Sequence, residues 1–556
     1  MYSNKDNINI LINLLIQFGV KYAVLCPGSR NSPIVHNIVE TKKFSCIPVT
    51  DERAAAFVAI GLSSINSTPI VICVTSGSAL LDTAPAIAEA YYRNLPIILI
   101  SADRPPQWIG QTDGQTINQV DALKNYVKKS INLIEPKNTE EKWFCNRLVN
   151  EALITATTYG AGPIHINVPI SEPLFDYSLK ELPQQRKITF FEAIPNVIVQ
   201  QHTVERFSKA KRPILIIGQL NLEEAKDIAN IVDKIKLTYT VIAERTANLN
   251  GYQNTYIDEA IINIGNDKKY YPDFIIYIGK AIISKRLKKF LRDSKPKDCI
   301  VVDKNGEIRD TFMTATEVHQ SSNKKFLEAI AHTITNNKKQ NSYYNIWNKL
   351  LTNIEKRAKT FKPDFSQMLA VKLLNKSFKK QQNIFTIYSN SSPIRLANIY
   401  AKSIIINNRG VNGIEGTIST AIGVAKYINN KFPVYCIIGD LSFFYDQNAL
   451  WIQNYPNNLH IILLNNKGGG IFHQLAGLNS SPYRDKFISG QHIYTAKDIC
   501  KNYNIKYFKA TNEEELLNEL KKLEKINDQA SILEVITDSD KDANVIKEYY
   551  KLFEKI

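Results

Sequence analysis

Short apolar segments alternate with amphipathic segments along most of the chain. Runs rich in Val and Ile, such as PIVICV, PIILIS and HIILL, end at Gly, Ser, Asp or Asn, and segments with helical spacing follow them. Buried parallel strands are apolar on both faces and are joined by crossover helices, so the pattern predicts parallel βαβ units. Ligands bind at the carboxyl ends of such strands, which makes the polar residues there the candidates for chemistry.

Two stretches interrupt this alternation. Residues 171–200 contain Pro and charged residues without a clear period, and residues 333–365 begin with a polar cluster. We interpret both as linkers. The sequence therefore predicts an α/β protein of three doubly wound parallel-sheet domains, at residues 1–180, 195–335 and 360–556. A chain of 556 residues has room for about three domains of typical size.

Composition agrees with a folded, soluble protein. The chain is 44% hydrophobic and 22% charged, which excludes a wholly disordered chain. It has no apolar run long enough to span a membrane. The N-terminus predicts an amphipathic helix and then a strand, without a basic leader, so we expect a cytoplasmic protein with no membrane span. Seven dispersed cysteines without a CxxC motif predict reduced core thiols.

The chain is basic, with a formal net charge of +16. Such a charge could serve a polyanionic partner. However, Lys is scattered among Asn and Ile over the whole chain, and the densest stretch, residues 280–293, has the spacing of a solvated helix face. We therefore expect no nucleic acid partner, and small anionic substrates fit the charge as well.

The richest polar signal follows two strands of the third domain. Asp440 ends the strand VYCII, and Asn466 ends the next strand, HIILL, one crossover later. Both side chains are thus predicted at one sheet edge, where a divalent ion that bridges a diphosphate would find hard oxygen ligands. Gly468 could turn its carbonyl toward that ion. Ser442 and the amides of a helix predicted at 443–455 could hold phosphate oxygens.

This Gly-Asp followed by Asn-Asn across one crossover resembles the signature of thiamin-diphosphate enzymes. Leu441 stands where that family usually has Gly, and Gly-Asp-Leu-Ser with NNKGGGIF (465–472) resembles one branch, the 2-succinyl-5-enolpyruvyl-6-hydroxy-3-cyclohexene-1-carboxylate synthases of menaquinone biosynthesis. The resemblance implies pyrimidine, central and diphosphate domains, with thiamin diphosphate and Mg²⁺ (or Mn²⁺) as cofactors. It implies metal ligands at Asp440, Asn466 and Gly468, and cofactor contacts from Gly439, Asp440, Leu441, Ser442 and Asn466.

Thiamin catalysis also needs a carboxylic acid hydrogen-bonded to the aminopyrimidine ring. Glu52 follows a strand and begins an apolar helix in VTDERAAAFVAIGLSS. Acidic residues are common at helix N-termini for electrostatic reasons alone, but beside the diphosphate signature Glu52 is the predicted catalytic acid and cofactor contact. Apolar neighbours should raise its pKa. The segments CPGSRNSP (26–33) and SADRPP (101–106) also resemble the synthase branch, and the resemblance covers nearly the whole chain.

The synthase branch joins 2-oxoglutarate to isochorismate, and both substrates are dicarboxylates. The site must therefore offer several fixed cations, and Arg binds a carboxylate through two parallel hydrogen bonds. Gly114 stands where many members of the branch have Asn. The resemblance implies an apolar cofactor wedge at Ile414, a cofactor and substrate contact at Ser391, and substrate contacts from Ser29, Arg30, Arg104, Gln115, Lys285, Arg286, Arg395, Arg409, Ile471 and Phe472.

The implied activity is that of a transferase, which decarboxylates 2-oxoglutarate and adds the succinyl unit to isochorismate in a 1,4-addition. The implied assembly is a homodimer or homotetramer with active sites at the subunit interface. One alternative is another thiamin-diphosphate 2-oxo-acid decarboxylase or acetolactate-type synthase. The other alternative is a non-catalytic, basic nucleic-acid-binding module, which need not have retained Glu52 or Asp440.

Overall fold

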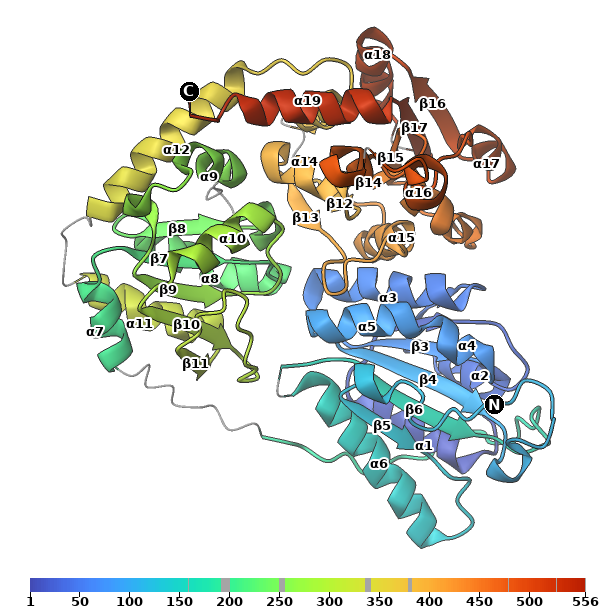
Figure 1. Ribbon diagram of the computed structural model, residues 1–556. Coiled ribbons are helices and arrows are strands. Elements are labelled where there is room, and N and C mark those ends of the chain that lie inside the picture. Colours follow the sequence, from blue (N-terminus) through green and yellow to red (C-terminus); the bar gives the residue numbers. More distant parts are fainter. Residues whose placement is uncertain are drawn as a thin grey trace. The chain divides into compact units, whose positions relative to one another are not determined.

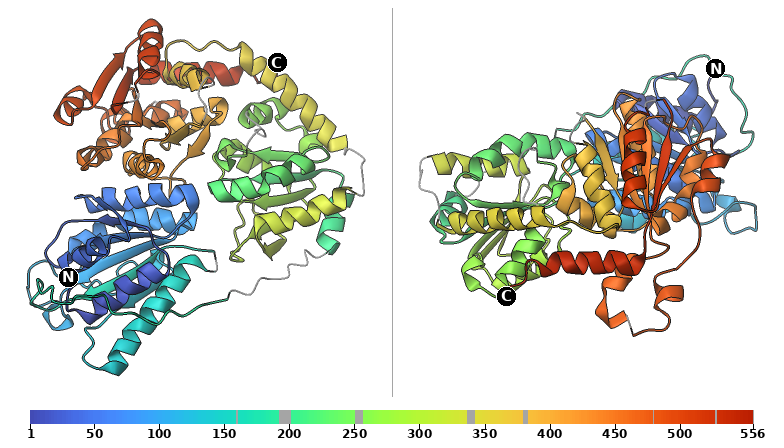
Figure 2. Two further views of the ribbon diagram at one scale, coloured as in Figure 1. Left: turned by 180° about the vertical axis from the view of Figure 1, so that it is seen from behind. Right: turned by 90° about the horizontal axis from the view of Figure 1, so that it is seen from above.

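The computed structural model describes residues 1–158, 160–191, 201–249, 256–335, 342–378, 383–478, 480–526 and 528–555. Three parallel sheets with covering helices form the fold (Figures 1 and 2), which confirms the predicted α/β class. The chain divides into two compact units. Unit 1 comprises Met1–Ala193, Asn408–Lys431 and Tyr445–Pro456, and unit 2 comprises Ile194–Asn407, Phe432–Phe444 and Asn457–Ile556.

The first sheet lies in unit 1 and has the strand order β2-β1-β3-β4-β6-β5. The chain enters it through an amphipathic helix followed by a strand, as predicted. The strands are β1 (Tyr22–Leu25), β2 (Ser45–Pro48), β3 (Ile70–Val74), β4 (Ile97–Asp103), β5 (Lys129–Asn132) and β6 (Ile164–Pro169). The helices are α1 (Asp6–Gln17), α2 (Ser32–Glu40), α3 (Glu52–Asn66), α4 (Ser78–Asp82), α5 (Ala84–Arg93) and α6 (Thr139–Thr157).

The second sheet lies in unit 2 and has the order β11-β10-β9-β7-β8. Its strands β7 and β9 are apolar and buried at every position, as expected for a parallel sheet covered on both faces. The strands are β7 (Pro213–Ile217), β8 (Thr240–Ala243), β9 (Phe274–Ile278), β10 (Asp298–Asp303) and β11 (Glu317–Gln320). The helices are α7 (Gln201–Lys209), α8 (Leu222–Ile235), α9 (Ile257–Ile264), α10 (Lys285–Ser294) and α11 (Asn323–Thr335).

The third sheet has the order β13-β12-β14-β15-β17-β16, which is the order of the first sheet when the strands are counted from β12. The two sheets thus share one topology without an obvious sequence repeat. The strands are β12 (Phe385–Tyr388), β13 (Ile404–Ile406), β14 (Val434–Gly439), β15 (Leu459–Asn465), β16 (Lys506–Ala510) and β17 (Ser531–Ile536). The helices are α13 (Gln367–Ser377), α14 (Ser392–Tyr400), α15 (Thr417–Ile428), α16 (Asp440–Tyr445), α17 (Lys497–Asn502), α18 (Glu513–Leu523) and α19 (Ser539–Lys551).

The predicted linkers are only partly correct. Most of 333–365 is helix α12 (Ser342–Thr360), which buries Tyr343, Trp347, Leu350, Ile354 and Ala358 along one face, while most of its other positions are polar. This narrow apolar stripe is easily missed in a Lys- and Asn-rich segment. Residues 336–341 of that linker, and residues 192–200 of the linker predicted at 171–200, lie outside the described residues.

The helix predicted at 443–455 is wrong in its limits. Helix α16 begins at Asp440 and ends at Tyr445, and a 3₁₀ helix spans Gln447–Trp451. The intervening Asp446 is buried, and its carboxylate accepts hydrogen bonds from the Ser419 backbone N–H and hydroxyl, both at 2.8 Å. A contact with a residue 27 positions away therefore fixes the end of the helix.

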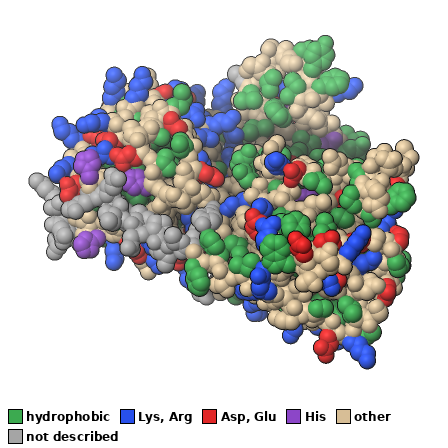
Figure 3. Space-filling model, turned by 90° about the horizontal axis from the view of Figure 1, so that it is seen from below, with side chains coloured by type: hydrophobic (Ala, Val, Ile, Leu, Met, Phe, Trp, Pro, Cys, Tyr) green, Lys and Arg blue, Asp and Glu red, His purple; other side chains and the backbone are tan. Residues whose placement is uncertain are grey.

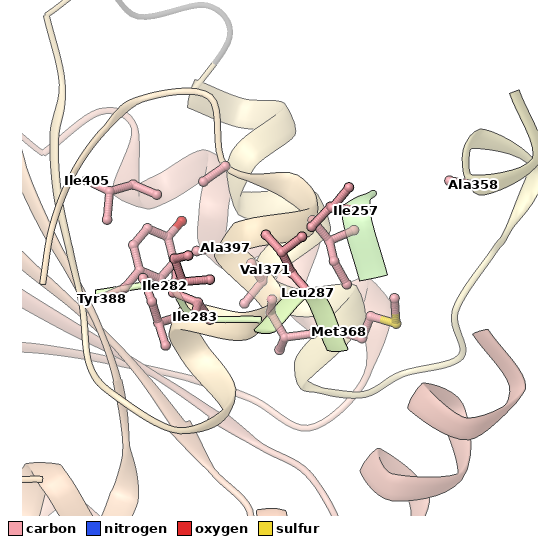
Figure 4. Packing of buried hydrophobic residues seen from close by; sticks show 14 of the residues in the cluster. Ile257, Ile282, Ile283, Leu287, Ala358, Met368, Val371, Tyr388, Ala397 and Ile405 are labelled. Atoms are coloured by element: carbon pink, nitrogen blue, oxygen red, sulfur yellow. The ribbon is translucent and has the colours of Figure 1, made fainter. Parts of the chain in front are cut away.

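The core of unit 2 is shared by the middle and third sheets. In the close view of Figure 4, Ile282, Ile283 and Leu287 of the middle domain pack with Val371 and Tyr388 of the third domain. All five residues are buried. The first turn of α10, which carries Lys285 and Arg286, is thus anchored on both sides by buried apolar residues.

Two glycines allow helices α3 and α15 of unit 1 to cross at backbone contact. A Cβ atom added at Gly61 would lie 2.1 Å from the carbonyl oxygen of Thr420, and one at Gly423 would lie 2.1 Å from the carbonyl oxygen of Val58. Both distances are far below van der Waals contact. The packing therefore ties α3, which begins at Glu52, to the helix that follows the 407–416 loop.

Substitution Gly61→Ala is expected to lower the free energy of unfolding by about 1–3 kcal/mol, because the methyl group would force the helices apart. Thermal denaturation followed by circular dichroism measures the effect. Gly477→Ala is the matched control, because no atom lies within 4 Å of an added Cβ there. Equal unfolding temperatures for the two variants would contradict the packing argument.

Candidate active site

Asp440 and Asn466 lie at the same edge of the third sheet, as the sequence predicts. Strand β14 pairs with β15 in parallel, and each residue follows the end of its strand. The Oδ2 atom of Asp440 accepts a hydrogen bond from the Gly468 N–H at 2.9 Å, so the three predicted metal ligands form one cluster with Asp440 and Asn466 both buried. His492 Nε2 lies 3.3 Å from the same oxygen. No sequence motif pointed to His492.

The orientation of Asn466 is set by helix α19. Its side-chain Nδ2 atom donates to Asp542 Oδ2 at 3.1 Å. Its backbone carbonyl oxygen accepts from the Ser539 hydroxyl at 2.9 Å. A carboxylate only accepts hydrogen bonds, so the amide nitrogen faces Asp542 and the amide oxygen remains as the ligand atom. A Cβ at Gly470 would lie 2.2 Å from Nδ2 of Asn466, which explains why glycine occupies this position.

The donor set fits a hard divalent cation. It combines the Asp440 carboxylate, the Asn466 amide oxygen and a backbone carbonyl at Gly468, which are oxygen ligands of the kind that Mg²⁺ binds. Gly468 has a φ of +155°, a conformation that a side chain would strain. Within the described ranges no cluster of three or more His, Cys, Asp and Glu side chains could hold a metal. A metal site here would therefore depend on amide and carbonyl oxygens.

The predicted cofactor contacts around Asp440 lie in one turn. The Gly439 N–H donates to the Ser389 hydroxyl at 3.3 Å, and the Leu441 N–H donates to Asp440 Oδ1 at 2.7 Å. Ser442 is buried in the first turn of α16. Ser391, with a φ of +70°, directly precedes α14. The Asp440 carboxylate is therefore held at Oδ1 by this turn and at Oδ2 by the Gly468 N–H of the loop after β15.

Glu52 is the first residue of α3, directly after the N-cap residue Asp51. It is half-buried, and burial raises its pKa, with smaller contributions from Asp82 and Asp51. This direction is the one that the sequence predicted. Its neighbours are held by the 445–448 segment of unit 1, because Asn448 donates to Asp51 at 2.9 Å and Arg53 donates to the Tyr445 carbonyl oxygen at 2.8 Å. The convergence of Glu52 with Asp440 of unit 2 stays a prediction.

A cavity of about 810 Å³ in unit 2 brings together five of the predicted substrate residues. Arg286 contacts Asp258 at 3.4 Å between Nη1 and Oδ2, and its guanidinium carbon lies 4.3 Å from the centre of the Tyr550 ring. Asp258 and Tyr550 were not predicted, because neither lies in a motif. The predicted residues that line the cavity are Lys285, Arg286, Arg395, Ile471 and Phe472.

The predicted substrate residues of the first domain lie on loops after β1 and β4. Arg30 is buried, donates to the Ile170 carbonyl oxygen at 2.9 Å and pairs with Glu172 at 3.0 Å. Arg104 pairs with Asp113 at 3.0 Å. Both arginines thus have partners within the chain, whereas Ser29 and Gln115 are exposed.

Arg409 and Ile414 share the loop between β13 and α15, in unit 1. The Ile414 side chain is 41% exposed, so it is not an ordinary core residue. The role of Ile414 as a cofactor wedge stays a prediction.

Comparisons with known proteins agree with this arrangement. Three family descriptions match in order: "Thiamine pyrophosphate enzyme, N-terminal TPP binding domain" at residues 7–123, "Middle domain of thiamine pyrophosphate" at 178–386, and "Thiamine pyrophosphate enzyme, C-terminal TPP binding domain" at 391–535. The chain is therefore a thiamin-diphosphate enzyme by fold and by domain order.

Full-length relatives narrow the class. The 2-succinyl-5-enolpyruvyl-6-hydroxy-3-cyclohexene-1-carboxylate synthases of Phocaeicola vulgatus and Bacteroides thetaiotaomicron are each 40% identical to this chain, over 99% of both sequences. The synthase of Porphyromonas gingivalis is 31% identical over 99% of this chain and 97% of its own. The chain belongs to the 2-succinyl-5-enolpyruvyl-6-hydroxy-3-cyclohexene-1-carboxylate synthase family.

The buried Glu259, beside the cavity residue Asp258, predicts a pH-dependent stability. Burial raises the pKa of Glu259 from 4.5 to about 7, and the Asp258 charge adds to the shift. Between pH 4.5 and pH 7 the folded state therefore keeps a proton on Glu259 that the unfolded state has lost. The free energy of unfolding falls as the pH rises through this range, because folding then requires that this proton be bound or that a charge be buried. Glu259→Gln should remove this loss, which is on the order of 3 kcal/mol. Urea unfolding at several pH values measures it, and parallel profiles for the two proteins would contradict it.

Proposed function

We propose that this protein is a thiamin-diphosphate-dependent transferase of menaquinone biosynthesis. It decarboxylates 2-oxoglutarate and adds the succinyl unit to isochorismate, giving 2-succinyl-5-enolpyruvyl-6-hydroxy-3-cyclohexene-1-carboxylate. The observation that carries this proposal is the end-to-end similarity to synthases of that name, at 40% identity over 99% of the chain. We propose three domains at 1–180, 195–335 and 360–556, and three domain matches in the same order support the number and order of these domains.

Asp440, Asn466 and the Gly468 carbonyl would hold Mg²⁺ or Mn²⁺, with Gly439, Leu441 and Ser442 beside the diphosphate. When bound, thiamin diphosphate supplies an electron sink that allows a 2-oxo acid to lose carbon dioxide. Glu52 would hold a proton at its carboxyl group toward the pyrimidine ring. Its raised pKa supports this role, because a carboxyl group that stays protonated can donate a hydrogen bond.

The substrates are dicarboxylates, and the cavity of unit 2 offers Lys285, Arg286 and Arg395 on one lining. These cations would bind and orient carboxylates, since an Arg fork matches the two carboxylate oxygens. Ile471 and Phe472 on the same lining would exclude water from the reacting carbon. Further substrate contacts are proposed for Ser29, Arg30, Arg104, Gln115, Ser391 and Arg409, and a cofactor contact for Ile414.

The proposed assembly is a homodimer or homotetramer with active sites between subunits, and the proposed location is the cytoplasm. Among the described residues, no helix is both long enough and apolar enough to cross a membrane. The seven cysteines are free thiols, and all except Cys46 are buried. On the face shown in Figure 3, Lys and Arg are spread among Asp and Glu, which does not favour the nucleic-acid-binding alternative.

Substitution Glu52→Gln is expected to reduce turnover by about 10²–10⁴-fold, because the amide cannot exchange a proton with the pyrimidine ring. The rate of product formation from 2-oxoglutarate and isochorismate is the measurement. Thiamin diphosphate affinity, measured by calorimetry, should be retained. Glu140→Gln, which also removes a carboxylate from a helix first turn, is the control. Turnover near that of the wild type would exclude the catalytic role of Glu52.

Substitution Asp440→Ala is expected to weaken Mg²⁺-dependent binding of thiamin diphosphate by at least about tenfold, because one charged ligand is lost. A calorimetric titration with and without Mg²⁺ measures the change. Asp498→Ala removes an exposed acidic residue from the first turn of α17 in the same domain and serves as the control. Unchanged affinity in the Asp440 variant would remove the metal assignment.

A further inference from the structure

Two buried glutamates hold loops in the same way in the two units. Glu89 on α5 and Glu244 after β8 are each 2% exposed. Each carboxylate accepts hydrogen bonds from two consecutive backbone N–H groups, one at each oxygen. Glu89 lies in the segment 74–92 (VTSGSALLDTAPAIAEAYY), which resembles the synthase branch, whereas Glu244 lies in no such segment. Neither residue is among the proposed cofactor or substrate contacts.

Glu89 holds the loop that carries Arg409. Its Oε1 accepts from the Gly410 N–H at 2.8 Å, and its Oε2 accepts from the Val411 N–H at 2.7 Å. On the other side of Arg409, Arg93 of the same helix donates to the Asn408 side chain at 3.1 Å. The backbone is thus fixed on both sides of Arg409.

The approach at this loop is close enough to require glycine. A Cβ at Gly410 would lie 2.8 Å from the backbone carbonyl oxygen of Glu89 and 3.0 Å from its Oε2. The absence of a side chain at position 410 therefore lets the loop reach the carboxylate.

Glu244 holds the loop that leads into α10. Its Oε2 accepts from the Ile283 N–H at 2.5 Å, and its Oε1 accepts from the Ser284 N–H at 2.7 Å. The Ser284 side chain caps α10 by accepting from the Leu287 N–H at 2.8 Å and also donates to Asp258. Lys285 and Arg286 follow directly, so their backbone is fixed by the same contacts.

We propose that Glu89 and Glu244 are positioning residues for substrate binding, which fix the loops of Arg409 and of Lys285–Arg286 so that these cations meet a dicarboxylate. The inference rests on the proposed function. Both loops follow a strand of a parallel sheet, where ligands bind. A buried carboxylate with two N–H partners fixes the local backbone firmly, because breaking either bond would leave a buried polar group without a partner.

The chain offers a clamp of the same kind, although less buried, outside the proposed site. Asp273, just before β9, accepts from the Lys211 and Arg212 N–H groups at 3.2 Å and 2.8 Å, again one at each oxygen. This clamp lies at the amino end of β7, where no proposed substrate residue lies. Asp273→Asn thus alters the same kind of contact without touching a substrate loop.

The test uses the full chain loaded with Mg²⁺ and thiamin diphosphate. Glu89→Gln keeps the size of the side chain, but its amide NH₂ group faces one N–H and can no longer accept from it. We expect the KM of one substrate to rise about tenfold, and that substrate should be the one whose KM also rises in Arg409→Ala. Glu244→Gln should raise the KM of the substrate affected by Arg286→Ala. Thiamin diphosphate affinity should be retained.

Double variants separate positioning from general stability. Glu89→Gln combined with Arg409→Ala should raise KM no further than Arg409→Ala alone, because the glutamate acts through the arginine. Asp273→Asn should lower the unfolding temperature without changing either KM.

Substitute variants are available if the glutamine variants fail to fold. Gly410→Ala would displace the loop of Arg409 and leave the Glu89 carboxylate in place, and Glu244→Asp would shorten the contact to the second loop. Each should raise the KM of the same single substrate.

Three results would overturn the inference. They are a KM for both substrates within about twofold of wild type in folded glutamate variants, additive effects in the double variants, or the same rise in Asp273→Asn. A wild-type protein that forms no product would reject the proposed function separately. In that case the affinity for glutarate, an unreactive dicarboxylate, is measured instead. The inference is supported if Glu89→Gln or Glu244→Gln weakens the binding of glutarate about tenfold and Asp273→Asn does not. Unchanged affinity in both glutamate variants rejects it.

Discussion

The parallel pairing of β14 with β15 places a buried carboxylate and a buried amide at one edge of the third sheet. Buried polar groups are costly unless they are hydrogen-bonded. The chain meets this requirement through the Gly468 N–H at Asp440 and through Asp542 and Ser539 at Asn466. The contact with Asp542 also fixes which end of the Asn466 amide carries the nitrogen, so that its side-chain oxygen is left for the proposed cation. The geometry of the proposed ion site is therefore a consequence of satisfying these two strand ends.

Helix α19 connects this proposed ion site with the cavity of unit 2. Its first turn holds Asn466, and its last turns place Tyr550 over Arg286 and Tyr549 against Glu259. A single helix of 13 residues thus contacts both places. Because a helix is stiff over this length, the distance between the proposed metal ligands and the proposed substrate cations is set by one element rather than by a flexible loop.

Several features could be predicted from local sequence and several could not. The Val- and Ile-rich strands were identified because a buried parallel strand must be apolar on both faces. Helix α12 was missed because only one narrow face is apolar, and its role in the core depends on packing against other elements of unit 2. The end of α16 was missed because it depends on the contact between Asp446 and Ser419. Contacts between distant residues leave no local pattern.

The sequence by itself determined the fold class, the family and the pairing of Asp440 with Asn466 across one crossover, because strand composition and motif spacing are local properties of the chain. Only the tertiary structure decided which groups support the proposed site. Asp542, Glu89 and Glu244 lie 76, 321 and 39 positions from the residues that they hold. Their side chains matter only where folding brings buried donors and acceptors together, and a sequence pattern does not record such pairs.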